Sequence, residues 1–306
     1  MKVMVTGAGG FVGAAFVARA LSVGHDVVAM VRPFGNLQRL TASRVEIVYA
    51  DMTNTSEVKS VMQQHRPEAI VHAAWSGVSN ASRNERSQLT DNMAAILALM
   101  DAAAATGVRK FVGIGSQAEY GLISGRIGET ALPAPTSLYG ATKVAVQVLA
   151  GQLCADTGID FAWLRLFSTY GPCDNPSWLI PSMVEALLDA KRPRTTEGRQ
   201  LWDYLFIDDV GDAIRAVVES KQAVGVLNLG SGMPVSIRSI IEQVRDIAAP
   251  GLPLVFGEIP YKADQIWHME ADIGKLTRLS GFRPKVTLTD GLSRTVAWHA
   301  SLRNAP

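Results

Sequence analysis

A tyrosine and a lysine stand four residues apart in the segment Tyr139-Gly140-Ala141-Thr142-Lys143. In a helix, residues at i and i+4 are neighbours on one face. A phenol is a weak acid with an ordinary pKa of about 10, and a neighbouring ammonium group lowers that pKa because it favours the phenolate. The spacing therefore predicts a helix on which Tyr139 transfers a proton beside Lys143. A solvent-exposed Tyr–Lys pair would have the same spacing.

A third group is the hydroxyl of Ser116, which follows the apolar run Lys110–Gly115. In open parallel sheets, ligands bind at the carboxyl ends of the strands. A hydroxyl at such a strand end can both donate to and accept from a reacting oxygen. We therefore expect Ser116, Tyr139 and Lys143 to form the catalytic group, with local bonding of Ser116 to the backbone as the alternative.

Glycines recur in the segment Thr6-Gly7-Ala8-Gly9-Gly10-Phe11-Val12-Gly13, between an apolar strand-like run and a helical pattern. Gly7, Gly10 and Gly13 permit a tight turn, a close approach of the backbone to a pyrophosphate and close packing of the helix on the strand. The start of the helix then offers free N–H groups to the phosphates. This context predicts a dinucleotide site that includes Phe11 and Val12.

The residue after the second strand decides which dinucleotide is expected. NAD-binding domains place a carboxylate there for the ribose hydroxyls, whereas this chain has Arg32. A cation suits a 2′-phosphate, so we expect NADP(H) in preference to NAD(H), unless Arg32 stacks on adenine or faces solvent. Asp51, with Met52 beside it, is expected to bind the adenine amino group, and it is also placed to cap a helix that starts near Thr55.

The surrounding elements fit this assignment, because short apolar runs alternate with helical patterns. Strands that are apolar on both faces and separated by helices indicate a parallel sheet covered on both sides. We therefore predict an α/β fold, a Rossmann-type doubly wound sheet. The expected strands are Lys2–Thr6, Asp26–Val31, Val45–Tyr49, Ala69–Ala73, Lys110–Gly115 and Phe161–Leu166, and the clearest helices are Phe11–Ser22 and Asn92–Ala105.

The chain changes character after residue 172, where Pro and Gly clusters separate shorter elements. We predict a dinucleotide-binding domain over 1–172 and a smaller region over 173–306 that mainly binds substrate. Residues 200–230 are expected to return to the first domain, with strands at Asp203–Ile207 and Val226–Leu229.

Composition excludes several classes of function. The 306 residues are 48% hydrophobic and carry a net charge of +1, so no global field would attract nucleic acid or a membrane surface. No apolar run reaches the roughly 20 residues that span a bilayer. The two cysteines, Cys154 and Cys173, predict neither a metal site nor a disulfide framework. We expect a cytoplasmic protein without a signal peptide, since Met1–Thr6 leads directly into the glycine cluster.

Several segments together carry a family resemblance that extends over nearly the whole chain. They resemble the extended short-chain dehydrogenase/reductase superfamily, in particular its nucleotide-sugar epimerases, dehydratases and 4-ketoreductases. The matching features are the glycines at 7, 10 and 13, Asp51, His72-Ala73-Ala74, Ser116, Tyr139-xxx-Lys143, the runs 164–172 and 203–210, Asn228-Leu229-Gly230-Ser231-Gly232 and Gly281-Phe282-Arg283-Pro284.

The resemblance implies roles for particular residues. Ser116, Tyr139 and Lys143 would be catalytic, and Lys143, Ala73, Ala74, Phe167 and Ser168 would contact the cofactor. It also implies a nucleotide-sugar substrate and a homodimer formed through the helix containing Met93–Ala105 and the helix following Tyr139. The apolar stripes of those helices could equally face only the sheet.

The chain also departs from the family pattern. Sugar 4,6-dehydratases carry an Asp–Glu pair after the catalytic hydroxyl residue, but this chain has Gln117 and Ala118, and Glu119 would point to another face if the segment were extended. Ser168 replaces the usual Asn, and Trp202 replaces the usual Arg that contacts the diphosphate. Either Arg199 takes over that contact or the pyrophosphate binds differently. The expected substrate contacts are Trp75, Gln117, Asn175, Trp178 and Arg199.

These departures favour one reaction. Without the carboxylate pair, elimination is not expected, and Arg32 favours a consumable NADPH over a retained NAD⁺. We therefore predict an NADPH-dependent 4-ketoreductase of a nucleotide-linked 4-keto-6-deoxyhexose. An NAD-dependent nucleotide-sugar epimerase is the alternative, and a non-catalytic dinucleotide sensor is a third, from a different class.

Overall fold

A seven-stranded sheet forms the centre of the molecule, in the computed structural model that describes residues 1–40 and 45–303. Its strand order is β11-β7-β5-β4-β1-β2-β3, and every neighbouring pair is parallel. The strands are β1 (Lys2–Thr6), β2 (Asp26–Val31), β3 (Glu46–Tyr49), β4 (Ala69–His72), β5 (Lys110–Ser116), β7 (Asp160–Leu166) and β11 (Gly225–Leu229). The predicted Rossmann-type α/β class is confirmed, and the order reverses between β1 and β4, where such sheets bind their ligands.

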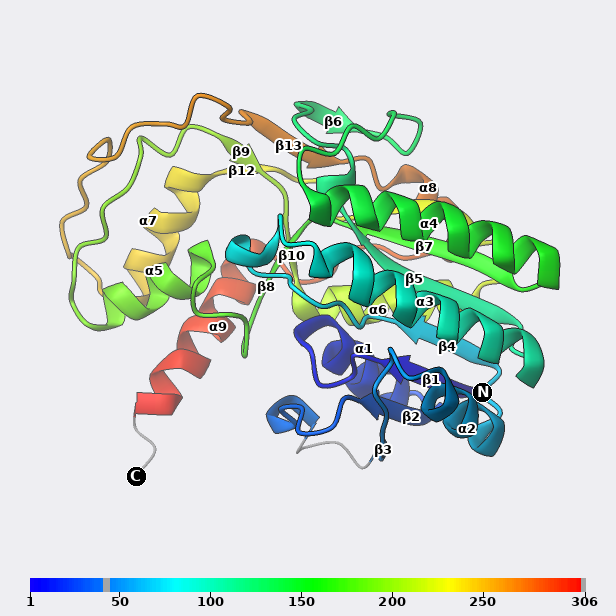
Figure 1. Ribbon diagram of the computed structural model, residues 1–306. Helices are drawn as coiled ribbons and strands as arrows, with labels where there is room; N and C mark the ends of the chain where they lie inside the picture. The colour runs from blue at the N-terminus through cyan, green and yellow to red at the C-terminus, as the bar shows by residue number, and fades with distance from the viewer. Residues whose placement is uncertain (41–44, 304–306) are drawn as a thin grey trace.

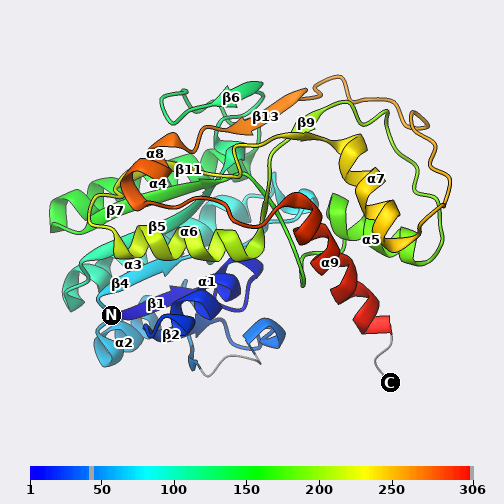
Figure 2. The same ribbon diagram turned by 180° about the vertical axis from the view of Figure 1, so that it is seen from behind.

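Helices cover both faces of this sheet. One face carries α2 (Thr55–His65), α3 (Ser87–Thr106) and α4 (Leu138–Thr157), and the other carries α1 (Phe11–Ser22) and α6 (Ile207–Glu219) (Figures 1 and 2). Helix α3 begins five residues before the expected Asn92, because its first turn is polar and adds nothing to the apolar pattern. Helix α4 begins at a Ser137 cap that accepts from the Gly140 N–H, and it ends at Gly158, whose φ of 71° is left-handed.

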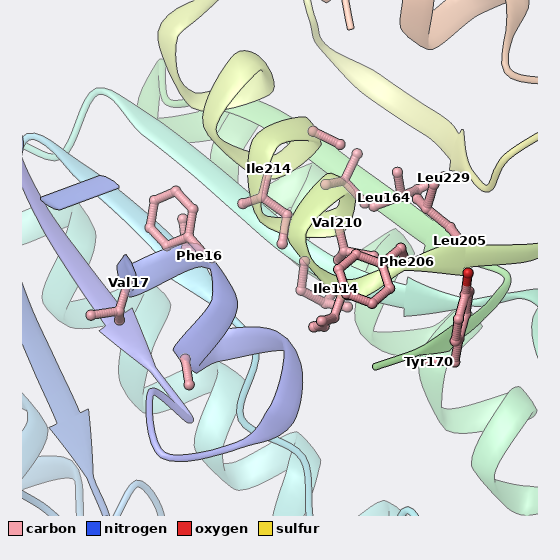
Figure 3. Packing of buried hydrophobic residues seen from close by; sticks show 14 of the residues in the cluster. Phe16, Val17, Ile114, Leu164, Tyr170, Leu205, Phe206, Val210, Ile214 and Leu229 are labelled. Carbon is pink, nitrogen blue, oxygen red and sulfur yellow. The ribbon is translucent and has the colours of Figure 1, made fainter. Parts of the chain in front are cut away.

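Helices α1 and α6 and the central strands share one hydrophobic core on this face of the sheet. Phe16 of α1 and Val210 and Ile214 of α6 lie against Ile114 and Leu164 of the central strands (Figure 3). All five side chains are at least 93% buried. A segment after residue 206 therefore completes the core around the main sheet.

A smaller region lies beyond the carboxyl edge of the sheet. Its helices α5 (Leu179–Leu188), α7 (Ile237–Ala248) and α9 (Leu288–Arg303) pack against one another (Figure 1). Its four-stranded sheet has the order β12-β9-β13-β6, from Val235–Ser236, Leu201–Trp202, His268–Ala271 and Gly125–Ile127. Because β6 comes from the first half of the chain, the two regions interleave. Helix α8 (Gly274–Ser280) packs on α6 and β11.

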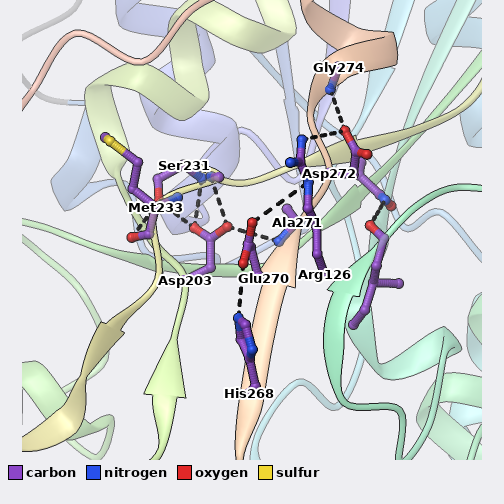
Figure 4. A network of polar contacts seen from close by, with 12 residues as sticks. Arg126, Asp203, Ser231, Met233, His268, Glu270, Ala271, Asp272 and Gly274 are labelled. Atoms are coloured by element: carbon purple, nitrogen blue, oxygen red, sulfur yellow. Dashed lines mark hydrogen bonds and ion pairs between the residues drawn. The ribbon is translucent and has the colours of Figure 1, made fainter.

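The segment Asp203–Ile207 does not form the expected strand of the main sheet. Its central part, β10 (Tyr204–Phe206), pairs in parallel with β8 (Ser168–Tyr170) in a separate two-stranded sheet, and Ile207 already begins α6. The physical reason is the fully buried carboxylate of Asp203, which accepts from the N–H groups of Ser231, Gly232 and Ala271 (Figure 4). Only α6 and β11 of this stretch join the dinucleotide domain.

Among the helices of the described residues, none is long and apolar enough to cross a membrane.

Candidate active site

A cavity of about 1600 Å³ lies along the carboxyl edge of the main sheet and reaches the smaller region. Single-ligand pockets measure roughly 300–1000 Å³, so this one has room for a dinucleotide and a second ligand. It is lined by the glycine loop, by the residues that follow β2, β4 and β5, by α4, and by loops of the smaller region.

The glycine loop has the geometry that a dinucleotide requires. Gly7 has a φ of +66°, and a Cβ there would lie 2.5 Å from the Ala74 nitrogen. A Cβ at Gly13 would lie 2.3 Å from the Gly7 carbonyl oxygen. Gly10 precedes α1 in an extended conformation, and no side chain of the described residues caps the helix, so its first N–H groups are left for a ligand in the cavity that these residues line. Phe11 and Val12 line the cavity beside the loop, as do Ala73 and Ala74.

Arg32 follows β2 at this end of the cavity. Its side chain is exposed, and it makes no ion pair or hydrogen bond with any residue in the described ranges. Asp51 and Met52 also line the cavity, and one Asp51 carboxylate oxygen accepts from the Thr53 N–H at 2.9 Å. The helix that starts at Thr55 is capped by the side chain of Asn54, so the capping role considered for Asp51 is wrong.

Tyr139 and Lys143 lie on one face of α4 and are buried, with 9% and 4% of their surface exposed. The solvent-exposed alternative is therefore wrong. The Lys143 ammonium donates to the carbonyl of Ile114 at 2.6 Å, and burial lowers the pKa of Lys143 to about 7. Burial also raises the pKa of Tyr139, an effect partly offset by a hydrogen bond with the Ser116 side chain and by the nearby charge of Arg83.

Ser116 is the last residue of β5, and it lines the cavity next to this pair. Its hydroxyl oxygen accepts from the Ala118 N–H at 3.2 Å, so the local backbone bond that we considered as the alternative does form. A hydroxyl that accepts one bond can still donate another. Both roles therefore fit the same geometry.

Glu119 serves the fold. The segment Gln117–Glu119 is a short 3-10 helix, so an extended conformation there is wrong. The Glu119 carboxylate is fully buried and accepts from Arg165 Nε at 2.6 Å and from Trp163 Nε1 at 2.9 Å. It does not line the cavity, whereas Gln117 does.

Most of the expected substrate contacts line the cavity. Trp75, Gln117, Asn175 and Trp178 line it, as do Phe167 and Ser168. Arg199 does not line it, because its side chain pairs with Glu197 at 2.7 Å in solvent. Two other cations, Arg194 and Lys262, do line the cavity.

The two departures from the family pattern are in direct contact. Trp202 and Ser168 both line the cavity, and the Trp202 indole N–H donates to the Ser168 hydroxyl at 2.6 Å. They lie 34 residues apart in the chain. The absence of the usual Asn and the absence of the usual Arg therefore affect one place in the cavity.

Some residues of the cavity wall were missed from the sequence. Asn92 holds the chain after β4, since its side-chain oxygen accepts from the Ser76 N–H at 2.8 Å. Burial raises the pKa of Asp174 to about 7. Asn92 and Asp174 stand next to recognised segments, whereas Arg83 and Arg194 lie in irregular loops, where no spacing indicates their direction.

Known proteins resemble this chain over its whole length. An uncharacterized UDP-glucose epimerase of Bacillus subtilis (strain 168) is 27% identical, across 99% of this chain and 99% of that protein. A dTDP-glucose 4,6-dehydratase of Streptomyces griseus is 30% identical, across 98% of this chain and 94% of its own. The crystal structure of a UDP-glucuronic acid 4-epimerase from Bacillus cereus in complex with NAD matches with a TM-score of 0.85 at 27% identity, and the match covers 99% of both chains.

A family model supports the same relationship. Residues 3–230 match the NAD dependent epimerase/dehydratase family, a stretch that contains the glycine loop, Ser116, Tyr139 and Lys143. From this match and from the geometry of the cavity we conclude that the chain belongs to the NAD-dependent epimerase/dehydratase family, within the extended short-chain dehydrogenase/reductase class of nucleotide-sugar enzymes.

Proposed function

We propose that this protein is an NADPH-dependent 4-ketoreductase of a nucleotide-linked 4-keto-6-deoxyhexose. The observation that carries the choice is Arg32, a cation without a partner in the described residues, at the strand end where NAD-binding domains carry a carboxylate. The glycine loop and the uncapped start of α1 would hold the pyrophosphate, and Arg32 would pair with a 2′-phosphate.

The chain's own residues supply the proton chemistry of such a reduction, and bound NADPH would supply the hydride. Ser116 donates a hydrogen bond to the sugar carbonyl oxygen, and Tyr139 gives its proton to that oxygen. Burial raises the pKa of Tyr139, which keeps the phenol protonated until it is needed. The Lys143 ammonium group, on the same face of α4, then favours the phenolate that remains.

Elimination is not part of the proposal, although dTDP-glucose 4,6-dehydratases are among the relatives. Gln117 and Ala118 carry no titratable group, and Glu119 is buried in its ion pair with Arg165. No carboxylate is left in this segment to remove a proton from the sugar.

Epimerisation is the second candidate, and the relatives favour it. The Bacillus cereus relative is named a UDP-glucuronic acid 4-epimerase and was crystallised with NAD. An epimerase with the same Ser116, Tyr139 and Lys143 would use Tyr139 first as a base and would keep its cofactor through the cycle.

Released nucleotide and cofactor competition distinguish the two candidates. The protein is purified and heat-denatured, and the released nucleotide is identified. NADPH and NADH then compete in one assay with a nucleotide-linked 4-keto-6-deoxyhexose. Reduction predicts an empty site and oxidation of NADPH. Stoichiometric bound NAD⁺ and interconversion of UDP-sugars would replace it with epimerisation, and tight dinucleotide binding without turnover of any sugar would indicate a sensor.

We also propose a cytoplasmic homodimer. Helices α3 and α4 pack against each other, and Leu97 and Val148 on them are 45% and 57% exposed. Apolar residues left in solvent on two adjacent helices fit a self-association surface. Light scattering should give twice the chain mass, and Val148→Asp should give the monomer mass with an unchanged circular dichroism spectrum. A wild-type monomer would contradict the proposal.

A further inference from the structure

Trp75 occupies a position in the catalytic end of the cavity that neither simple packing nor substrate contact explains. It is the third residue after β4, and its ring lies face-on to the Lys143 ammonium group, with the nitrogen 3.5 Å from the ring centre. The ring of Tyr139 meets Trp75 edge-on, at 5.9 Å between centres and an angle of 81°. One indole thus contacts both members of the Tyr–Lys pair.

A hydrogen bond to a side chain of α3 holds the indole in place. Its N–H donates to the side-chain oxygen of Gln88 at 2.9 Å. Gln88 is fully buried, and its amide donates to the backbone carbonyls of Gly77 and Ser82. The next residue, Ser76, donates its N–H to Asn92, one helical turn beyond Gln88. Trp75 therefore has a defined orientation before any ligand binds.

Lys143 has few other partners that favour its charge, since the rings of Trp163 and Tyr139 lie farther away, with centres 5.8 and 5.9 Å from its nitrogen. Its one hydrogen bond among the described residues is to the Ile114 carbonyl, and no carboxylate of these residues lies within ion-pair distance. Glu119 acts on it only at longer range and is already paired with Arg165. A buried ammonium with so few partners tends to lose its proton. An aromatic face within about 6 Å opposes that loss by attracting the cation.

We propose that Trp75 is a positioning residue, whose indole face keeps Lys143 protonated and in place beside Tyr139. The interaction itself stands on geometry alone. Its consequence for turnover rests on the proposed function, because it requires Tyr139 and Lys143 to act on a sugar. The tests below separate the two.

Other charged or titratable groups surround the pair, and none replaces Trp75. From β4, His72 bonds to the Thr6 hydroxyl, and burial lowers the pKa of His72 to about 3, so it stays neutral at neutral pH. The Arg83 guanidinium lies 5.0 Å from the Tyr139 ring centre and adds a positive charge. From α4, Tyr139 has a raised pKa and stays a neutral phenol. Glu119 comes from the segment after β5.

The first test needs no substrate. An ammonium group and a neutral amine perturb an indole differently, so Trp75 fluorescence should change as Lys143 titrates. Emission of the apoprotein is measured from pH 5.5 to 9 for wild type and Trp75→Phe, and their difference removes other contributions, such as Trp298 beside His299. We expect a difference component with a midpoint near 7, the pKa of Lys143. The component should vanish in Lys143→Met. A flat difference, or one that persists in Lys143→Met, would overturn the proposal.

The second test is the pH dependence of kcat/KM. Trp75→Leu keeps apolar bulk but removes the aromatic face, so Lys143 should deprotonate earlier and the alkaline limb should move down by roughly one pH unit. Trp75→Phe should restore most of the limb, whereas Trp267→Phe, at an exposed tryptophan outside the cavity, should leave the position of the limb unchanged.

If kcat/KM of the Trp75 variants falls equally at every pH and the alkaline limb does not move, Trp75 only packs in the site or contacts the substrate. That result would contradict the proposal. Should wild type turn over no sugar, the proposed function fails while the fluorescence test still decides the role of Trp75.

Discussion

The two ends of the cavity are built in different ways. At the catalytic end, Ser116, Tyr139 and Lys143 come from a strand end and the first two turns of a helix, and these groups are largely buried. At the substrate end, Arg194 and Lys262 come from irregular stretches of the smaller region and face solvent. Regular elements fix the direction of a side chain, whereas loops leave it to the surrounding structure.

The departures from the family pattern follow the same division. The proposed catalytic residues match the pattern, but Ser168 and Trp202 do not, and these two bond to each other where the cavity passes into the smaller region. A family match over residues 3–230 therefore says more about the chemistry than about the sugar. The fold is shared with the family, and we expect the less regular end to carry the specificity.

The largest effect should come from the catalytic end. Tyr139→Phe removes the proton that the reaction needs, so kcat should fall by on the order of 10²–10⁴, with dinucleotide affinity retained. Turnover and NADPH binding are measured side by side. Tyr49→Phe, on exposed β3, is the matched control and should behave as wild type. A Tyr139→Phe enzyme with near-normal kcat would show that Tyr139 does not supply the proton, and the catalytic end would then no longer differ from the substrate end in this respect.

The buried ammonium group of Lys143, at the catalytic end, should also lower the stability of the folded protein. The pKa of Lys143 is lowered to about 7 from an unfolded value of 10.5, so below pH 7 the folded state carries a buried charge at a cost. Stability should rise with pH between these two values. Lys143→Met removes the cost and should raise the free energy of unfolding at pH 7 by roughly 4 kcal/mol, a gain that shrinks toward pH 10.

Urea unfolding at several pH values measures this gain. Lys110 is a suitable comparison, because it is a buried lysine at the opposite end of β5 whose ammonium bonds two backbone carbonyls. Burial lowers the pKa of Lys110 as well, but its two carbonyl bonds compensate more of the cost, so Lys110→Met should gain less stability than Lys143→Met and keep its turnover. A Lys143→Met protein that is less stable than wild type at pH 7 would show that the ammonium is well accommodated and that the cost is absent.

The glycine loop and Arg32 line a third part of the cavity, and Arg32 tests its role in cofactor choice. Arg32→Ser removes a charge-assisted contact worth about 1.5–3 kcal/mol, so the KM for NADPH should rise roughly tenfold to a hundredfold, while that for NADH stays unchanged. Lys59→Gln, on the exposed side of α2, is the control. Equal changes in the KM for NADPH and the KM for NADH would show that Arg32 does not recognise the 2′-phosphate.

The smallest effect is expected at the substrate end. Arg194→Ala should raise the KM for the nucleotide sugar by roughly fivefold, since an exposed charge pair is worth about 1 kcal/mol or less. Arg199→Ala should change little, because Arg199 lies outside the cavity and pairs with Glu197. The opposite ranking would restore Arg199 as the substrate contact. It would also mean that the loop around residues 194–199 rearranges on binding.

Regular segments of the chain could be predicted closely, and irregular ones could not. The bounds Lys2–Thr6, Phe11–Ser22 and Asp26–Val31 agree with β1, α1 and β2 because apolar period and glycine punctuation coincide there. The 3-10 helix at Gln117–Glu119 has no period to detect. The pairing of Tyr204–Phe206 with β8 depends on the buried Asp203, whose partners lie 28 or more residues away.

The sequence by itself determined that Gly7, Gly10 and Gly13 share a loop and that Tyr139 and Lys143 share a helical face. These relations are local, and backbone geometry sets them. Only the tertiary structure decided that Trp75 lies over Lys143, that Trp202 bonds to Ser168 and that Arg199 turns away from the cavity. Contacts between segments so far apart depend on how the sheet, α3 and the smaller region pack, and no spacing along the chain encodes that packing.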